Sequence, residues 1–293
     1  MINAHPQVAI PPEAKFVERL IAVEPQFRQG DGSLNVEALT ADLLADPHFL
    51  EWDLPAEHVR REIAALRDPD LAAVLAAAYR AYAALRGKPR WGDKTPRHVR
   101  YLPVLARMWP DARFVHLIRD GRDVATSLNS APFGPKTTVA QARYWANRVR
   151  DGVRDGGRLG PDRYLEVRYE SLVREPASEL LRICELIDLP FDAAMIAHHE
   201  LSAGTIPRSE FAHQHGAMNR VRQGARDWRT EMTPSEISAF EAAEGRLLDE
   251  LGYQRGGKRA PVAWMEARFG DIRESVDLRR RLRRRLGLWG SAQ

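Results

Sequence analysis

The chain has 293 residues, of which 44% are hydrophobic and 29% charged, so it can build the core of one large domain or of two small ones. Its formal net charge is only +4, and much of the positive excess lies in the C-terminal run LRRRLRRRLGLWG, which excludes a nucleic-acid-binding body on composition. The single cysteine, Cys184, excludes an intrachain disulfide, and its apolar helical context ELLRICELI predicts a buried thiol and suits a cytoplasmic protein.

The first third of the chain is predicted to be largely helical. Pro12 suits the first turn of a helix that runs to about Val23. From about residue 34 to 86 the sequence is rich in Ala and Leu with helical spacing, and prolines interrupt the pattern, which predicts a helical subdomain. The next segment, KPRWGDKTPRH, is predicted to be a loop, and Pro103 should bend or interrupt a helix over residues 97–109.

The middle of the chain alternates predicted strands and helices. Apolar runs at 114–118 and 163–168 predict buried strands. A helix is predicted to begin at Asp120, another to cover 139–155, and a third to begin at Pro176. Strand–helix units in series predict an α/β fold with a parallel sheet flanked by helices, and ligands of such sheets bind at the carboxyl ends of the strands.

The clearest predicted helix is TPSEISAFEAAEGRLLDELG. Thr233 and Glu236 have the spacing of a capping box, Pro234 takes the first helical position, and Gly252 lies just past the end.

After this helix we expect a basic C-terminal extension over residues 256–293, with a single α/β domain over residues 1–255. The tail has leucines at helical spacing between arginines. That pattern favours an amphipathic helix packed on its own domain, with an anionic membrane surface as the alternative partner.

A charged segment, RDGRDVATS, follows the first predicted strand. Arg119 comes directly after the strand, and the next helix offers free N–H groups and a partial positive end, which together favour an anion such as a phosphate. Ser127 lies two helical turns after Asp120 on the same face, within reach of an anion held by Arg119. The alternative is that the two arginines and two aspartates of this segment form local ion pairs that cap the helix.

Five segments, in order, resemble the PAPS-dependent sulfotransferase family, in which PAPS (3′-phosphoadenosine-5′-phosphosulfate) donates the sulfuryl group. RDGRDVATS resembles the 3′-phosphate-binding motif, with an arginine at a strand end and a serine eight residues later. HPQVAIPPE resembles the segment after the phosphosulfate loop, WGDKTP a loop of the protein-tyrosine and glycan branch, VRYESLVREP the YEDL…P segment, and VRQGARDWR the late R-x-G-x-x-x-x-W loop. The resemblance runs from about residue 3 to Tyr253 and points to bacterial members related to that branch.

The resemblance implies a nucleotide site for PAPS and its product PAP. Arg119 and Ser127 would hold the 3′-phosphate, and Arg222 and Gly224 of VRQG would add a second contact to it. Tyr169 would contact the adenine. The alternatives are a surface arginine at 222 and an ordinary aromatic residue at the sheet end.

The resemblance also implies in-line sulfuryl transfer to a hydroxyl or amine without a metal. Glu13, in AIPPE, matches the catalytic glutamate and would accept the acceptor's proton. The alternative is a first-turn glutamate favoured by the helix dipole. Lys94, in GDKTP, would neutralise charge on the donor. Asp93 beside it is a second candidate base, or it orients Lys94.

One family element, a strand followed by a phosphosulfate loop of the form G-x-P-R-S-G-T-T, is absent from this sequence. The implied fold is thus a P-loop-like parallel sheet flanked by helices, with a helical insertion, whose first strand and phosphate loop are missing. Either the native chain starts further upstream, which we favour, or it is a truncated paralogue. We expect little or no sulfotransferase activity from the 293-residue chain.

A second hypothesis, from a different class, is a non-catalytic PAP- or PAPS-binding scaffold that keeps Arg119, Ser127 and Arg222. A P-loop kinase is disfavoured because no G-x-x-x-x-G-K-[ST] segment occurs.

The acceptor is expected to be a small molecule, a glycan or a peptide, and no nucleic-acid partner is expected. Four aromatic residues of and near the helical region offer pocket walls: Trp52, Tyr79, Tyr82 and Trp91.

Overall fold

The computed structural model describes residues 1–198 and 227–256. Their contacts divide them into two units, one with residues 1–116 and 152–198, the other with residues 117–151 and 227–256. The expected sites Arg222 and Gly224, and the basic tail from residue 257, lie outside the described residues.

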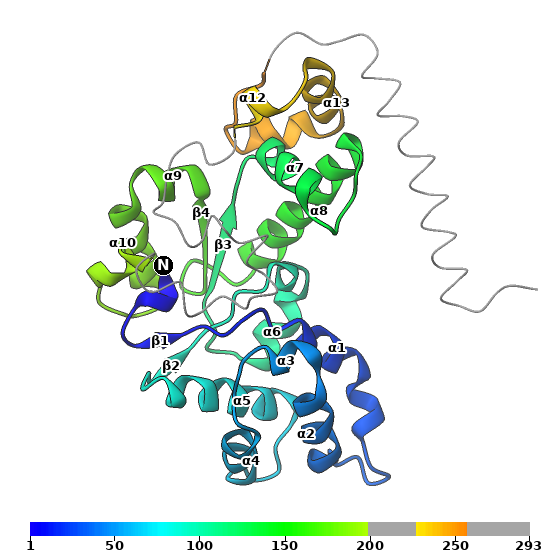
Figure 1. Ribbon diagram of the computed structural model, residues 1–293, viewed down its shortest axis with the longest axis vertical. Helices are drawn as coiled ribbons and strands as arrows, with labels where there is room; N and C mark the ends of the chain where they lie inside the picture. Colours follow the sequence, from blue (N-terminus) through cyan, green and yellow to red (C-terminus); the bar gives the residue numbers. More distant parts are fainter. Residues whose placement is uncertain (199–226, 257–293) are drawn as a thin grey trace, which may run out of the picture. The chain divides into compact units, whose positions relative to one another are not determined.

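Helices make up most of the first unit (Figure 1). They are α1 (Lys15–Val23), α2 (Val36–Ala45), α3 (Pro47–Leu50), α4 (Ala56–Ala64), α5 (Leu71–Leu85), α6 (Leu102–Met108), α9 (Tyr169–Arg174) and α10 (Pro176–Leu186), with the 3₁₀ turns η1 (Ile2–Ala4), η2 (Glu24–Phe27), η3 (Pro96–Tyr101) and η4 (Ala193–Met195). The predicted proline breaks are confirmed, because Pro47 opens α3 and Pro55 precedes α4. Pro69 precedes Asp70, whose carboxylate accepts from the Ala73 N–H and caps α5.

The aromatic residues of the helical region form a core rather than an open pocket wall. Trp52, Tyr79 and Tyr82 are 1–2% exposed. The Trp52 ring packs 4.9 Å from that of Tyr79 and 5.2 Å from that of Phe16, centroid to centroid. The expectation that these three residues line a pocket is wrong, because α1, α3 and α5 close over them. Trp91 is half-buried and stacks on Tyr79.

Two small parallel sheets make this an α/β fold, as predicted. β1 (Val8–Ala9) pairs in parallel with β2 (Arg90–Trp91). β3 (Phe114–Ile118) pairs with β4 (Tyr164–Arg168). The Phe114 N–H donates to the carbonyl of Arg163, the residue before β4, at 2.8 Å, so the two strands start at the same end.

Two helix starts differ from the predicted ones. α1 begins at Lys15, so Pro12 lies ahead of the helix, in a bend after β1. Tyr169 is the first residue of α9, a short helix for which no start was predicted. Pro103 behaves as predicted, since a 3₁₀ turn covers the residues before it and α6 starts at Leu102.

The second unit contains α7 (Gly121–Ser130), most of α8 (Thr138–Gly157), α12 (Trp228–Glu231) and α13 (Pro234–Glu250). α8 and β3 each contribute to both units. Ile118, Trp145 and Phe240 lie at the centre of the second unit's core. The predicted capping box of α13 is confirmed.

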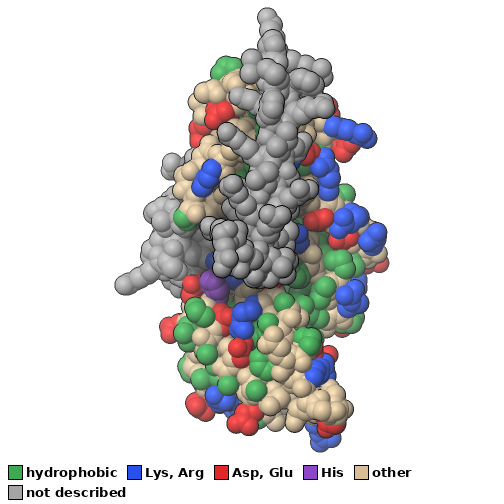
Figure 2. All heavy atoms as spheres, turned by 90° about the vertical axis from the view of Figure 1, so that its right-hand side faces the viewer, with side chains coloured by type: hydrophobic (Ala, Val, Ile, Leu, Met, Phe, Trp, Pro, Cys, Tyr) green, Lys and Arg blue, Asp and Glu red, His purple; other side chains and the backbone are tan. Residues whose placement is uncertain are grey.

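The described surface carries mixed charge. On the face shown in Figure 2, Lys and Arg side chains are interspersed with Asp and Glu. In the same part of the chain, no helix is long and apolar enough to cross a membrane.

Candidate functional site

Glu13 and Lys94 meet in the first unit as a close ion pair. The Lys94 ammonium donates to Glu13 Oε1 at 2.6 Å, and the Lys15 ammonium lies 3.8 Å from Glu13 Oε2. The Glu13 side chain is 14% exposed, whereas that of Lys94 is 54% exposed. Glu13 precedes α1 by two residues, so it is not the first-turn glutamate of the structural alternative. The structure thus brings together two of the candidate residues that the sequence motifs name.

Asp93 is the centre of a hydrogen-bond network behind this pair. Its Oδ2 accepts from the Tyr79 hydroxyl at 2.9 Å and from the Thr95 hydroxyl at 3.2 Å. Its Oδ1 lies 2.8 Å from His98 Nδ1. Thr95 in turn accepts from the N–H of Ala14 at 2.8 Å, so the network ties the Lys94 loop to the residue next to Glu13. A carboxylate with this many partners supports the orienting role for Asp93 over that of a second base.

Lys88 fixes the two segments that carry this pair. Its ammonium donates to the carbonyls of Asn3, His5 and Val8 at 2.7–2.9 Å, next to the β1–β2 pairing. Burial lowers the pKa of Lys88, with the nearby Arg86 charge as a smaller cause. The ammonium therefore holds the strand before Glu13 to the strand before Lys94.

The second unit places Arg119 at the end of β3, directly before α7, as predicted. Its guanidinium donates to Asp123 Oδ2 at 3.3 Å. Asp120 caps α7 by accepting from the Arg122 N–H at 2.9 Å. Ser127 lies one turn after Asp123 on α7 and its side chain is exposed.

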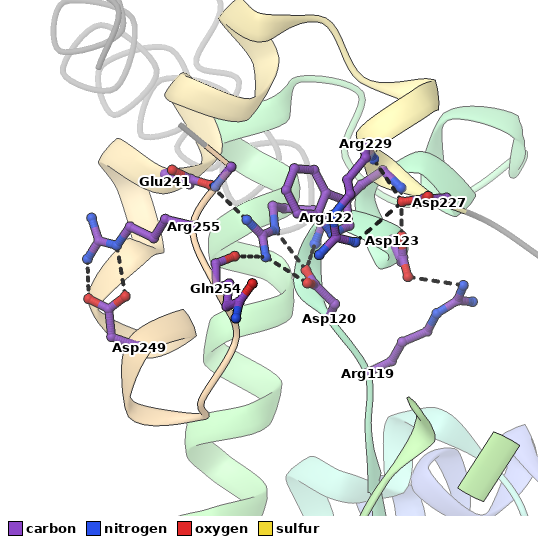
Figure 3. A network of polar contacts seen from close by, with 12 residues as sticks. Arg119, Asp120, Arg122, Asp123, Asp227, Arg229, Glu241, Asp249, Gln254 and Arg255 are labelled. Atoms are coloured by element: carbon purple, nitrogen blue, oxygen red, sulfur yellow. Dashed lines mark hydrogen bonds and ion pairs between the residues drawn. The ribbon is translucent and has the colours of Figure 1, made fainter. Parts of the chain in front are cut away.

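Arg122 is fully buried and belongs to the network of polar contacts drawn in Figure 3. Its guanidinium donates to Asp120 and Glu241 at 2.7–3.0 Å and to the Gln254 carbonyl at 2.7 Å. It also lies 3.6 Å above the Trp228 ring. Burying a guanidinium is tolerated only with such full pairing.

The same carboxylate that pairs with Arg119 also holds the start of α12. Asp123 Oδ1 accepts from the Trp228 N–H at 2.9 Å. Burial raises the pKa of Asp123, and the bonds from Trp228 and Arg119 act against that rise. The local ion pairs of the structural alternative are therefore present, and Arg119 pairs within α7's first turn.

Sequence reasoning missed the partners of these residues. No sequence motif singles out Thr95, and Tyr79 was expected in the wall of an acceptor pocket rather than as a partner of Asp93. The alternative interpretation gives Arg122 only a local partner, whereas Glu241 and Trp228 complete its surroundings in the structure. The Arg119–Asp123 pair is one of the local ion pairs that the alternative interpretation of this segment names. Of the other expected residues, Tyr169 lies at the end of β4 and is half-buried.

The comparisons with known proteins concern most of the chain. The sequence profile of the sulfotransferase family matches residues 1–193. A Caenorhabditis elegans protein named "Putative protein-tyrosine sulfotransferase" is 31% identical over 168 residues, which are 56% of this chain and 62% of that protein. The nodulation protein NoeE of Sinorhizobium fredii is 30% identical over 208 residues, 63% of this chain and 49% of that protein. The chain thus spans about half to three fifths of the length of these curated relatives.

Solved structures support the fold. The sulfotransferase domain of the curacin biosynthetic pathway superposes with a TM-score of 0.56 at 16% identity, covering 87% of this chain and 92% of that one. The sulfotransferase domain of the Synechococcus PCC 7002 olefin synthase gives a TM-score of 0.56 at 22% identity, covering 86% and 88%. Because the family profile covers well over half of the residues, the chain belongs to the sulfotransferase family.

Proposed function

We propose that the protein transfers a sulfuryl group from PAPS to a hydroxyl or amine of an acceptor. The observation that carries the proposal is the place of Arg119, at a strand end directly before the N-terminus of α7, in a chain of the sulfotransferase family. Arginine suits a phosphate, and a helix N-terminus favours the same anion.

Arg119 and Ser127 are the proposed contacts of the 3′-phosphate. Both lie in the second unit, on the segment from the end of β3 through α7. Arg222 and Gly224 remain proposed as a further contact and Tyr169 as the adenine contact, on the strength of the sequence motifs. The exposed hydroxyl of Ser127, one turn beyond Asp123, can donate to a phosphate oxygen.

Glu13 is the proposed general base. In the transfer, the bond between sulfur and the donor's bridging oxygen breaks, a bond from sulfur to the acceptor oxygen forms, and the acceptor proton moves to the Glu13 carboxylate. The Lys94 ammonium would leave Glu13 to neutralise negative charge on the transferring group. Lys94 suits that role because its side chain is more than half exposed while its loop is held by Asp93 and Thr95.

The names of the relatives suggest the acceptor class. Proteins named as protein-tyrosine and carbohydrate sulfotransferases match this chain, the latter over 31% of its length. We propose a peptide, glycan or small molecule that presents a hydroxyl. A protein that binds the nucleotide without turnover is the second candidate, because the motif residues Arg119 and Ser127 serve binding by themselves.

Isothermal titration of PAP into the wild type and into Arg119→Ala tests the proposal. We expect saturable 1:1 binding by the wild type and at least about tenfold weaker binding by the variant, because an arginine–phosphate contact is charge-assisted. Arg246→Ala removes a 90% exposed arginine of the same unit and should bind like the wild type. Equal affinity in all three proteins, or no binding by the wild type, would reject the donor site.

Incubation with ³⁵S-labelled PAPS and a panel of tyrosine peptides and glycans separates the two candidates. Label on an acceptor supports the enzyme. PAP binding with no transfer to any acceptor supports the binding protein.

A further inference from the structure

We propose that Asp123 is a positioning residue of the donor site: it holds the Arg119 guanidinium in the orientation that receives the 3′-phosphate. The inference rests on the proposed function and adds to it a residue outside the phosphate contacts. It follows from the geometry of the Asp123 carboxylate, whose two oxygens face different partners (Figure 3).

One oxygen faces Arg119 and the other faces the main chain. Oδ2 accepts from Arg119 Nη2 at 3.3 Å, and Oδ1 accepts from the Trp228 N–H at 2.9 Å. The shorter bond is to a backbone group, which cannot rotate away as a side chain can. The bond from the Trp228 N–H therefore sets the plane of the Asp123 carboxylate, and Oδ2 faces Arg119 as a result.

The main-chain partner is itself held. The Trp228 ring lies against the guanidinium of Arg122, which is fully buried and bonded to Asp120, Glu241 and Gln254. Trp228 is 3% exposed. The buried contacts of Arg122 therefore hold Trp228, the Trp228 N–H holds Asp123, and Asp123 holds the Arg119 guanidinium.

A long arginine side chain loses rotamer freedom when it binds a ligand, and a carboxylate that already orders it reduces that loss. Arg119 is further placed by its own backbone, because its carbonyl accepts from the Trp145 indole N–H at 3.0 Å. Its side chain is only 22% exposed. The guanidinium group is planar, so the bond to Asp123 also fixes the directions in which its remaining N–H groups point.

The sign of the effect distinguishes positioning from plain electrostatics. A carboxylate beside an anion site repels the anion, so removing its charge should strengthen phosphate binding if Asp123 has no other role. If Asp123 orders Arg119, removing the charge weakens phosphate binding instead.

Asp123→Asn separates the two bonds of this carboxylate. The amide oxygen can still accept from the Trp228 N–H, while the amide nitrogen replaces the oxygen that faces Arg119. We expect PAP affinity to fall about tenfold, equivalent to about 1.4 kcal/mol. Binding of adenosine 5′-phosphosulfate, which has no 3′-phosphate, should stay within twofold of the wild type.

Glu250→Gln is the matched control, because it neutralises a surface carboxylate of the same unit, bonded to Arg246, without touching the contacts that hold Arg119. It should leave the affinity for PAP within twofold of the wild type. Asp123→Glu, which keeps the charge, should recover part of the lost affinity.

Unchanged or tighter PAP binding by Asp123→Asn overturns the inference, as does an equal loss for both nucleotides. If Arg119→Ala loses PAP and Asp123→Asn does not, the positioning role fails while the donor site stands. If the wild type binds no PAP, both fail.

Discussion

Glu13 lies two residues ahead of α1, and this position decides what its carboxylate can do. A first-turn glutamate would turn toward the helix N–H groups, whereas Glu13 pairs with Lys94 across 81 residues of sequence. The alternative of a dipole-stabilised helix residue therefore does not apply. A carboxylate paired with an exposed lysine can exchange that partner for an acceptor hydroxyl, as the proposed role of Glu13 as base requires.

The first prediction concerns this base. Glu13→Gln keeps size and removes the proton-accepting charge, so whatever rate of sulfuryl transfer the chain sustains should fall by about 10²-fold or more. The rate is measured with labelled PAPS, and PAP affinity should not change. Glu57→Gln, at an exposed position of α4, is the control. Equal rates in Glu13→Gln and the wild type would remove Glu13 from the mechanism.

Sequence reasoning at this scale succeeded where the partners are local. Asp120 caps α7 and Thr233 caps α13, as their spacing predicts. The burial of Arg122 could not be predicted, because its partner Glu241 is 119 residues away in the sequence. A local Arg–Asp motif gives no indication of which arginine will be covered.

At the scale of elements, the start of α7 requires glycine, which has no side chain, at position 121. A Cβ on Gly121 would lie 2.4 Å from the Trp145 ring and 2.7 Å from that of Phe240. α7 can therefore approach α8 and α13 closely only with glycine here. The same approach places Arg119 and Asp123 at either side of this position.

Gly121→Ala should accordingly destabilise the protein by about 1–3 kcal/mol through overpacking, measured as a drop in the free energy of unfolding by urea. The control is Gly157→Ala, near the end of α8, where a Cβ meets nothing within 4 Å. Alanine there should be neutral or slightly stabilising. Matching stabilities for the two variants would contradict the close packing of α7.

Element boundaries were predictable where proline or a capping residue marks them. Pro47 and Pro55 did so for α3 and α4, and Pro234 for α13. Pro12 led to a wrong boundary because it lies in a bend after β1, and α1 starts only at Lys15. Proline suits a bend as well as a first helical turn, so the residue alone does not decide.

At the scale of the whole molecule, stability should depend on pH through a half-buried histidine of the first unit, His116. His116 Nδ1 lies 2.7 Å from the Tyr164 hydroxyl, which donates to Glu166 at 3.2 Å. Burial, and secondarily the Arg168 charge, lowers the pKa of His116 from 6.5 to about 4. Gly152 of α8 packs directly on its ring.

The folded protein thus resists protonation of His116 while the unfolded chain accepts the proton. Stability is fully present above pH 6.5 and is lost as the pH falls toward about 4, at up to about 1.4 kcal/mol per pH unit. His116→Gln removes this titration and leaves all other groups in place. The melting temperature of the wild type should fall more steeply over this range than that of His116→Gln, and parallel curves would contradict the lowered pKa.

The sequence predicted the α/β class and the order of strands and helices, because the spacing of apolar residues and the positions of proline and capping residues are local features. It did not predict that Lys88 ties the segment before Glu13 to the strand before Lys94. That pairing depends on which strands become neighbours, and such information appears only when distant segments pack. The sequence motifs therefore nominate candidate groups, but not the residues that hold them in place.

The central claim is that Arg119 and Ser127 bind the 3′-phosphate of the sulfuryl donor. The most direct measurement is a crystal structure of the protein with PAP. The account predicts the 3′-phosphate within hydrogen-bond distance, about 2.7–3.1 Å, of the Arg119 guanidinium and the Ser127 hydroxyl. A nucleotide bound with its 3′-phosphate away from both residues would contradict it.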